Sequence, residues 1–250
     1  MRRGRVRRTT LVGALCALAV ASTGLTGCGG GDADPDAGTN GVGKLTPKEI
    51  QTRTRTAAEA AETVRLAGSV TAGGTSYRLD MRLKEDGGTG SVTSGTSTFQ
   101  LLRIGEELFL KASADFWTDG GKGGGGGKDT AAAGKLDGKY VKVPQGDPSY
   151  RRFSGFTQKD VLLKGLLTLH GALSTDGRHE QSGVRTVRLT GDKGAGGTLD
   201  VSLEGTPYPL RLARAGDAGT LTFSDWGKDF PLEEPAKDET VDYGQQLPTS

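Results

Sequence analysis

The residue with the clearest chemistry is Cys28, whose thiol is a nucleophile that can accept a diacylglycerol group. The chain begins with five arginines within its first eight residues, continues with an apolar run from Leu11 to Val20, and then has small residues. A basic segment, a short apolar segment and a small-residue zone make up a signal peptide, and this run is too short for a membrane-spanning helix. The sequence therefore predicts a signal peptide over residues 1–27 that is cleaved between Gly27 and Cys28.

The residues Leu25-Thr26-Gly27-Cys28 resemble the lipobox of bacterial lipoproteins, in which an aliphatic residue and two small residues precede the modified cysteine. This resemblance implies a diacylglycerol thioether and further acyl chains, such as palmitate, on Cys28. Two or more chains hold a protein stably at a bilayer. We therefore expect a lipoprotein anchored on the extracytoplasmic side of the cell membrane. The alternative is a plain secretory signal followed by a chance cysteine.

Charge and cysteine usage exclude several classes of partner. The leader holds five of the 32 basic residues and none of the 30 acidic ones, so the remaining chain carries 27 against 30, a net charge of −3. A nucleic-acid-binding protein needs a basic face on the scale of the domain, which this balance does not supply. Cys16 leaves with the leader and Cys28 is expected to be acylated, so we expect neither a disulfide nor a cysteine-ligated zinc site.

Catalytic and metal-binding motifs are absent from the sequence. It contains no Gly-x-Ser-x-Gly, Ser-x-x-Lys or His-Glu-x-x-His motif. Its two histidines, His170 and His179, flank the turn-like residues 175–177, and we expect neither to be a ligand. The sequence therefore predicts a protein that is not an enzyme and has no metal or cofactor.

Two helices are predicted. Thr46-Pro47-Lys48-Glu49 is a capping box with proline at the first helical position, and small apolar residues then recur at helical spacing up to Ala61. The second helix is expected over 157–169, with Thr157 as the N-cap and Asp160 three residues later. It is much richer in leucine and therefore requires an apolar partner.

Between and after these helices the apolar period is two, which is typical of strands. Strands are expected at 64–70, 77–84, 89–93, 98–104, 108–112, 139–144, 184–190, 198–203, 210–213 and 220–224, with a closing strand or arm at 226–235. The expected organisation is a flexible tether at 28–44, one domain at 45–235 with a glycine-rich loop at 118–137, and a loose tail at 236–250.

Four segments carry a resemblance to the LppX/LprG family of actinobacterial lipoproteins, which share the half-barrel of the periplasmic lipoprotein carrier LolA. The lipobox contributes to the same resemblance, and the segments are 97–111, 138–141, 208–212 and 221–227. The resemblance implies an α+β fold in which a strongly curved, open antiparallel sheet of about 10–11 strands has helices on its concave face. It also implies an apolar cavity that binds or carries a lipid or glycolipid.

The expected pocket residues are apolar side chains on the predicted strands and on the leucine-rich helix. They are Tyr77, Leu79, Met81, Leu83, Phe99, Leu101, Phe109, Leu163, Leu166 and Leu167. At these spacings the same residues also suit an ordinary core. The alternative function is therefore a membrane-tethered interaction or accessory module with a filled core, no lipid ligand and a membrane-protein partner. Trp117 and Trp226 are expected to anchor a loop and a sheet edge.

Overall fold

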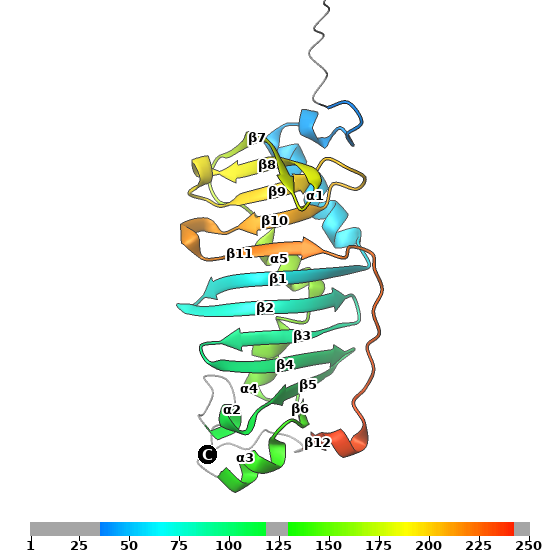
Figure 1. The fold of residues 1–250 in the computed structure, drawn as a ribbon, viewed down its shortest axis with the longest axis vertical. Coiled ribbons are helices and arrows are strands. Elements are labelled where there is room, and N and C mark those ends of the chain that lie inside the picture. Colours follow the sequence, from blue (N-terminus) through cyan, green and yellow to red (C-terminus); the bar gives the residue numbers. More distant parts are fainter. Residues whose placement is uncertain (1–35, 119–129, 243–250) are drawn as a thin grey trace, which may run out of the picture. The chain divides into compact units, whose positions relative to one another are not determined.

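Twelve strands form one open sheet in the computed structural model, which describes residues 36–118 and 130–242 (Figure 1). The sheet order is β12-β6-β5-β4-β3-β2-β1-β11-β10-β9-β8-β7. The strands are β1 (Thr63–Ala72), β2 (Thr75–Lys84), β3 (Gly87–Ser94), β4 (Ser97–Ile104), β5 (Glu107–Ala112), β6 (Tyr140–Val143), β7 (Leu173–Gln181), β8 (Val184–Gly191), β9 (Thr198–Ser202), β10 (Pro209–Ala213), β11 (Thr220–Ser224) and β12 (Thr240–Asp242).

The sheet consists of two runs of neighbouring strands joined at one seam. Strands β1 to β6 form an antiparallel meander, and β7 to β11 form a second one. The two runs meet where β1 pairs with β11, and β12 adds to β6 in parallel. The predicted open sheet is confirmed, but it has twelve strands rather than 10–11 and is mixed rather than wholly antiparallel.

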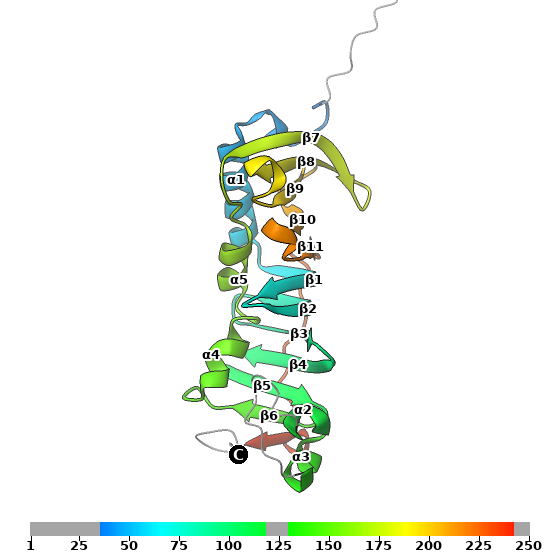
Figure 2. The same ribbon diagram turned by 90° about the vertical axis from the view of Figure 1, so that its left-hand side faces the viewer.

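The longest helices cover one face of this sheet. Figure 2 shows α1, α5 and α4 along the same face, whereas α2 and α3 lie at the β6 end. The α-helices are α1 (Pro47–Ala60), α2 (Ala114–Thr118), α3 (Thr130–Leu136), α4 (Pro148–Ser154) and α5 (Lys159–Leu166). The 3-10 helices are η1 (Val42–Lys44), η2 (Asp192–Gly194), η3 (Ala215–Asp217) and η4 (Lys237–Glu239). None of the helices in the described residues is long and apolar enough to cross a membrane.

Helix α1 begins where the capping box predicts. The backbone N–H of Glu49 donates to Thr46 Oγ1 at 3.4 Å, and the backbone N–H of Thr46 donates to Glu49 Oε2 at 2.9 Å. These two bonds satisfy donors that a helix start leaves open. Its narrow apolar face is buried at Ile50, Thr54 and Ala58.

The leucine-rich segment differs from the single helix expected at 157–169. A helix, α4, precedes it and ends at Ser154, a turn covers 155–158, and the segment itself forms only α5, which ends at Leu166. Thr157 is not the cap, because its hydroxyl donates to the Ser154 carbonyl at 2.9 Å and accepts from Arg103 Nε at 3.2 Å. Gln158 is the N-cap instead. Asp147 caps α4, since its Oδ1 accepts from the Ser149 N–H at 2.7 Å.

Strand β7 was not predicted, because its sequence is polar rather than alternating. The expected turn at 175–177 is a bulge within it, between Thr175 and Arg178. Most of its side chains are exposed, as expected of an edge strand that must not pair further.

Three expected boundaries are wrong because local contacts order the chain beyond them. In the predicted tether, residues 36–44 fold onto the domain: Val42 is buried and Asn40 Nδ2 donates to the carbonyls of Ser202 and Gly205, both at 3.0 Å. In the predicted glycine-rich loop, α3 forms and buries Ala133 and Leu136. In the predicted tail, residues 237–242 form η4 and β12. Residues 1–35, 119–129 and 243–250 lie outside the description.

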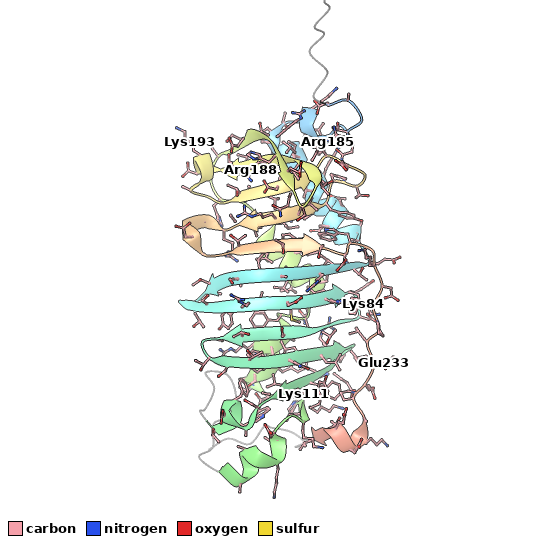
Figure 3. All side chains as sticks on the ribbon, viewed as in Figure 1. Lys84, Lys111, Arg185, Arg188, Lys193 and Glu233 are labelled. Atoms are coloured by element: carbon pink, nitrogen blue, oxygen red, sulfur yellow. The ribbon has the colours of Figure 1, made fainter. Side chains whose placement is uncertain are left out.

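The arm at 226–235 runs past the ends of the strands from β11 to η4 (Figure 1). Phe230 is buried, and Lys84 Nζ donates to its carbonyl at 3.2 Å and pairs with Asp229 at 3.5 Å. Figure 3 shows Lys84 beside this arm. Trp226 anchors the beginning of the arm, where its ring stacks on Tyr208 at 4.6 Å. Because it follows β11, a strand in the interior of the sheet, it does not lie at a sheet edge as expected.

Candidate functional site

The connection between α4 and α5 lies directly against the sheet. A Cβ atom added at Gly88 on β3 would lie 2.7 Å from Leu83 Cδ2 and 3.0 Å from the Thr157 carbonyl oxygen. Arg103 on β4 is buried there, and its Nη2 donates to the same Thr157 carbonyl at 3.1 Å. A glycine without a side chain and an arginine that donates to the helix layer therefore hold this connection directly against β3 and β4.

On the α5 side of that connection the space between sheet and helices is filled. Ile50, Met81, Leu83, Leu163 and Leu167 are each at most 1% exposed. Such burial stabilises the fold by roughly 1.5–3 kcal/mol for each large apolar side chain.

Lys159, the first residue of α5, also contributes to the packing on the α5 side of the connection. Its Nζ is buried and donates to the carbonyls of Glu59 and Ala61, at 3.1 and 2.5 Å. These carbonyls lie at the C-terminal end of α1, where a helix leaves acceptors without intrahelical partners. Lys159 therefore fixes α5 to α1.

On the α4 side of the connection an open groove of about 510 Å³ remains. It lies between the β1–β2 and β3–β4 hairpin turns, α2 and α4. Its lining residues are Gly74, Thr75, Ser76, Tyr77, Ser94, Gly95, Thr96, Ser97, Phe99, Phe116, Arg152, Phe153 and Phe156.

Aromatic rings form the wall of this groove. Phe99 packs against Phe116 and Phe153 with centroid distances of 5.3 and 5.2 Å, and Tyr77 packs against Phe156 at 5.5 Å. Tilted and edge-on rings at these distances attract one another through their quadrupoles. The wall is thus built from two strands, two short helices and the α4–α5 connection, and their rings support each other.

The hairpin turns form the polar rim of the groove. Gly73 and Gly74 both have positive φ, at 56° and 75°, as a type I′ turn between β1 and β2 requires. Gly95, with φ of 60°, begins the two-residue turn between β3 and β4. Tight turns of this kind bring the hydroxyl-bearing residues next to them to the edge of the aromatic wall.

Helix α4 is fixed by Tyr150 as well as by its own cap. The Tyr150 hydroxyl donates to the Glu106 carbonyl, in the β4–β5 turn, at 2.7 Å. Burial raises the pKa of Tyr150, so the hydroxyl stays protonated as a donor throughout the neutral range. This contact positions Arg152 and Phe153 over the ends of the strands.

Of the ten residues predicted to line a pocket, Tyr77 and Phe99 line the groove. Seven others form the packed core with the helices and are not among the lining residues: Leu79, Met81, Leu83, Leu101, Leu163, Leu166 and Leu167. Phe109 lies on the opposite face of the sheet, because it pairs with Leu102, whose neighbour Leu101 faces the helices. Cys28 lies outside the described residues.

Sequence reasoning missed Phe116, Arg152, Phe153 and Phe156. The available signal was the pair Phe153 and Phe156, three residues apart after the helix start Asp147-Pro148. Their ring partners come from distant strands, however, so the sequence does not show that they meet.

The histidines make contacts that a structural role explains. His179 Nε2 lies 2.7 Å from the Asp176 carbonyl, and the His170 backbone N–H donates to the Gly196 carbonyl at 3.1 Å. Residues 36–118 and 130–242 contain no group of three or more His, Cys, Asp or Glu side chains placed to hold a metal ion. Trp117, expected to anchor a loop, is buried and packs against Phe116 at 5.1 Å.

An open twelve-stranded sheet with helices along one face is a fold that can be compared with those of solved proteins. No protein-family model matches the chain, and no curated protein matches it in sequence. Solved structures do match. The crystal structure of LprF from Mycobacterium bovis superimposes with a TM-score of 0.53 and 16% identity, over 76% of this chain and 97% of LprF.

Two further structures match with lower scores. Mycobacterium tuberculosis lipoprotein LppX has a TM-score of 0.46 and 16% identity, over 75% of this chain and 98% of its own. An uncharacterized conserved protein from Thermus thermophilus has a TM-score of 0.38 and 12% identity, over 78% and 98%. The chain thus has the fold of LprF, and the expected LppX/LprG-type architecture is confirmed at the level of the fold.

Proposed function

We propose that this chain is a membrane-anchored, extracytoplasmic lipoprotein that binds a lipid in the aromatic groove. The observation that carries the proposal is the groove of about 510 Å³ with five aromatic side chains in its lining. Ligand pockets usually have volumes of about 300–1,000 Å³ and mostly apolar walls with a few polar groups. The fold shared with LprF, an open sheet with helices along one face, supports the assignment to this type of lipoprotein.

The site differs from the one expected from the sequence. A cavity between the sheet and the leucine-rich helix is not supported, because the residues of that region are packed together in the core. The ligand would instead lie at the strand ends, against rings. Burial of apolar ligand surface there is worth about 25 cal/mol per Å².

Anchoring through Cys28 would keep the domain close to the bilayer. The described domain begins at Asp36, eight residues after Cys28, and eight residues span at most about 28 Å. Residues 36–44 then dock on the β7–β9 end of the sheet through Asn40 and the pair of Asp36 with Arg178.

Lipid binding is tested with an exported Cys28→Ser chain, purified and extracted with organic solvent for mass spectrometry. We expect lipid in the extract, and less of it from Phe156→Ala, which removes one wall of the groove. Val161→Ala is the matched control, since Val161 is an apolar residue of α5 that is 56% exposed and lies outside the groove. A lipid-free extract from the unsubstituted Cys28→Ser chain, even after incubation with membranes, would exclude this function.

The anchor is tested separately by intact-mass analysis of the native product. We expect the mass of residues 28–250 plus diacylglycerol and acyl chains. An unmodified N-terminus would contradict it.

A second candidate function is supported by the filled interior. The packed region under α1 and α5 is what a membrane-tethered interaction module would have. This function predicts that Phe156→Ala changes neither the lipid content nor the phenotype of the strain, and that crosslinking of the acylated chain in intact cells yields one defined membrane-protein partner.

A further inference from the structure

The groove carries a charge pattern that specifies its ligand further. Among the described residues that line the groove, Arg152 is the one charged side chain, and no carboxylate accompanies it. Its guanidinium carbon lies 5.9 Å from the Phe153 ring centroid, and its Nη2 lies 3.5 Å from the Tyr77 hydroxyl. The cation therefore lies at the aromatic wall without an acidic partner among the described residues that line the groove.

The rim supplies hydroxyl groups around the same space. Five hydroxyl residues line it: Thr75, Ser76, Ser94, Thr96 and Ser97. Within residues 36–118 and 130–242 none of these five hydroxyls makes a hydrogen bond to another protein group. They are therefore free to donate to a ligand.

We propose that the groove binds an anionic lipid whose head group is a phosphate ester, with the phosphate at Arg152 and the rim hydroxyls and an acyl chain along the rings. This inference rests on the proposed lipid binding and specifies its ligand class. A guanidinium can donate two parallel N–H···O bonds to the two charged oxygens of a phosphate diester, and these oxygens and the polar head-group substituent can also accept from the rim hydroxyls. A fatty-acid carboxylate offers two charged oxygens but no polar head-group substituent beyond them, so it would leave more of the rim without a partner.

The experiment is calorimetric titration of the exported Cys28→Ser chain with short-chain probes kept below their micelle concentrations. The probes are dioctanoylphosphatidylglycerol, uncharged dioctanoylglycerol and laurate. We expect dioctanoylphosphatidylglycerol to bind about tenfold more tightly than either of the other two, and less tightly as salt rises, because the rim is exposed to solvent.

Substitutions at neighbouring arginines provide the matched pair. Arg152→Gln should lower the affinity for dioctanoylphosphatidylglycerol about tenfold and leave the affinity for dioctanoylglycerol unchanged. Arg151→Gln, which removes the adjacent exposed arginine outside the groove, should change either affinity less than twofold. Thermal unfolding of both variants checks that they remain folded.

The outcomes separate this inference from the proposed function. Equal affinities for the phosphate and uncharged probes, or an Arg152→Gln effect no larger than that of Arg151→Gln, would overturn the head-group inference while lipid binding stands. If laurate binds more tightly than dioctanoylphosphatidylglycerol, the preferred anion is a carboxylate rather than a phosphate, and the head-group inference is also overturned. If the chain binds none of the three probes, the proposed function itself fails.

Discussion

The two sides of the α4–α5 connection use the same sheet face in opposite ways. On the α5 side, leucines and Ile50 fill the space and Lys159 ties α5 to α1. On the α4 side, aromatic side chains and two hairpin turns line an open groove. The contact of Thr157 with Gly88 and Arg103 lies between the two regions, so we expect it to limit how far the helix layer fills the sheet.

The largest effect that tests this comparison is expected for Leu163→Ala. Leu163 is fully buried in the closed region, so the cavity should destabilise the domain by about 2–5 kcal/mol. Chemical denaturation measures this loss, with Val161→Ala on the exposed side of α5 as a control that should change stability by less than about 0.5 kcal/mol. A small effect of Leu163→Ala would mean that the region is not tightly packed.

Lys159→Met should have the next largest effect. The substitution keeps much of the apolar stem but leaves the carbonyls of Glu59 and Ala61 without their buried donor, which costs about 1–3 kcal/mol. Lys164→Met, on the exposed part of the same helix, is the control. Hydrogen exchange should increase at the C-terminal end of α1 in the first variant alone, and equal exchange in both would contradict the tie between the helices.

Gly88→Ala sharpens the comparison, because it acts at the border between the two regions. Its methyl group would meet Leu83 and the Thr157 carbonyl, and overpacking typically costs about 1–3 kcal/mol. The lower part of that range is expected, since the Leu83 side chain can shift. Gly134→Ala, which has open space around it, should not destabilise the domain. If Gly88→Ala is neutral as well, the close approach does not limit the helix layer.

The smallest effect is expected on the opposite face, from Asp80→Asn. Hydrogen bonds from Arg65 lower the pKa of Asp80, with Arg65 Nε and Nη2 donating at 2.9 and 2.8 Å. Both side chains are more than a third exposed, so the pair contributes only about 0.5 kcal/mol at pH 7.

The sign of this pH dependence follows from the lowered pKa. The stabilisation is present above the unfolded-state pKa of Asp and is lost as the pH falls through the lower folded-state pKa. The difference in melting temperature between the original chain and Asp80→Asn should therefore disappear in strong acid. A difference that persists there would assign the effect to packing rather than to charge.

Sequence patterns among neighbouring residues were sufficient to predict much of the fold. The capping box at Thr46 and the alternation from Tyr77 to Leu83 are set by neighbouring residues, and both elements form as predicted. Strand β7 was missed because its side chains are polar on both faces, and pairing with β8 alone makes it a strand.

The groove was only partly predictable because tertiary placement creates it. Tyr77 and Phe99 have the spacing of core residues, and nothing local distinguishes them from Leu79 and Leu101. They line a groove because α5 begins after Thr157, so that α4 rather than α5 lies beside the strand ends that carry Tyr77 and Phe99. The turn within the leucine-rich segment depends on Arg103, 54 residues away from Thr157 in sequence.

The parallel addition of β12 to β6 has a consequence for solubility. Strand β6 contains Val141 and Val143, both buried, and without β12 its unpaired N–H and C=O groups would be available to another chain. At the other border β7 carries exposed charged residues that discourage such pairing. By covering β6, residues 237–242 thus protect the sheet against edge-to-edge aggregation. Their exposed position and polar sequence do not by themselves indicate this role.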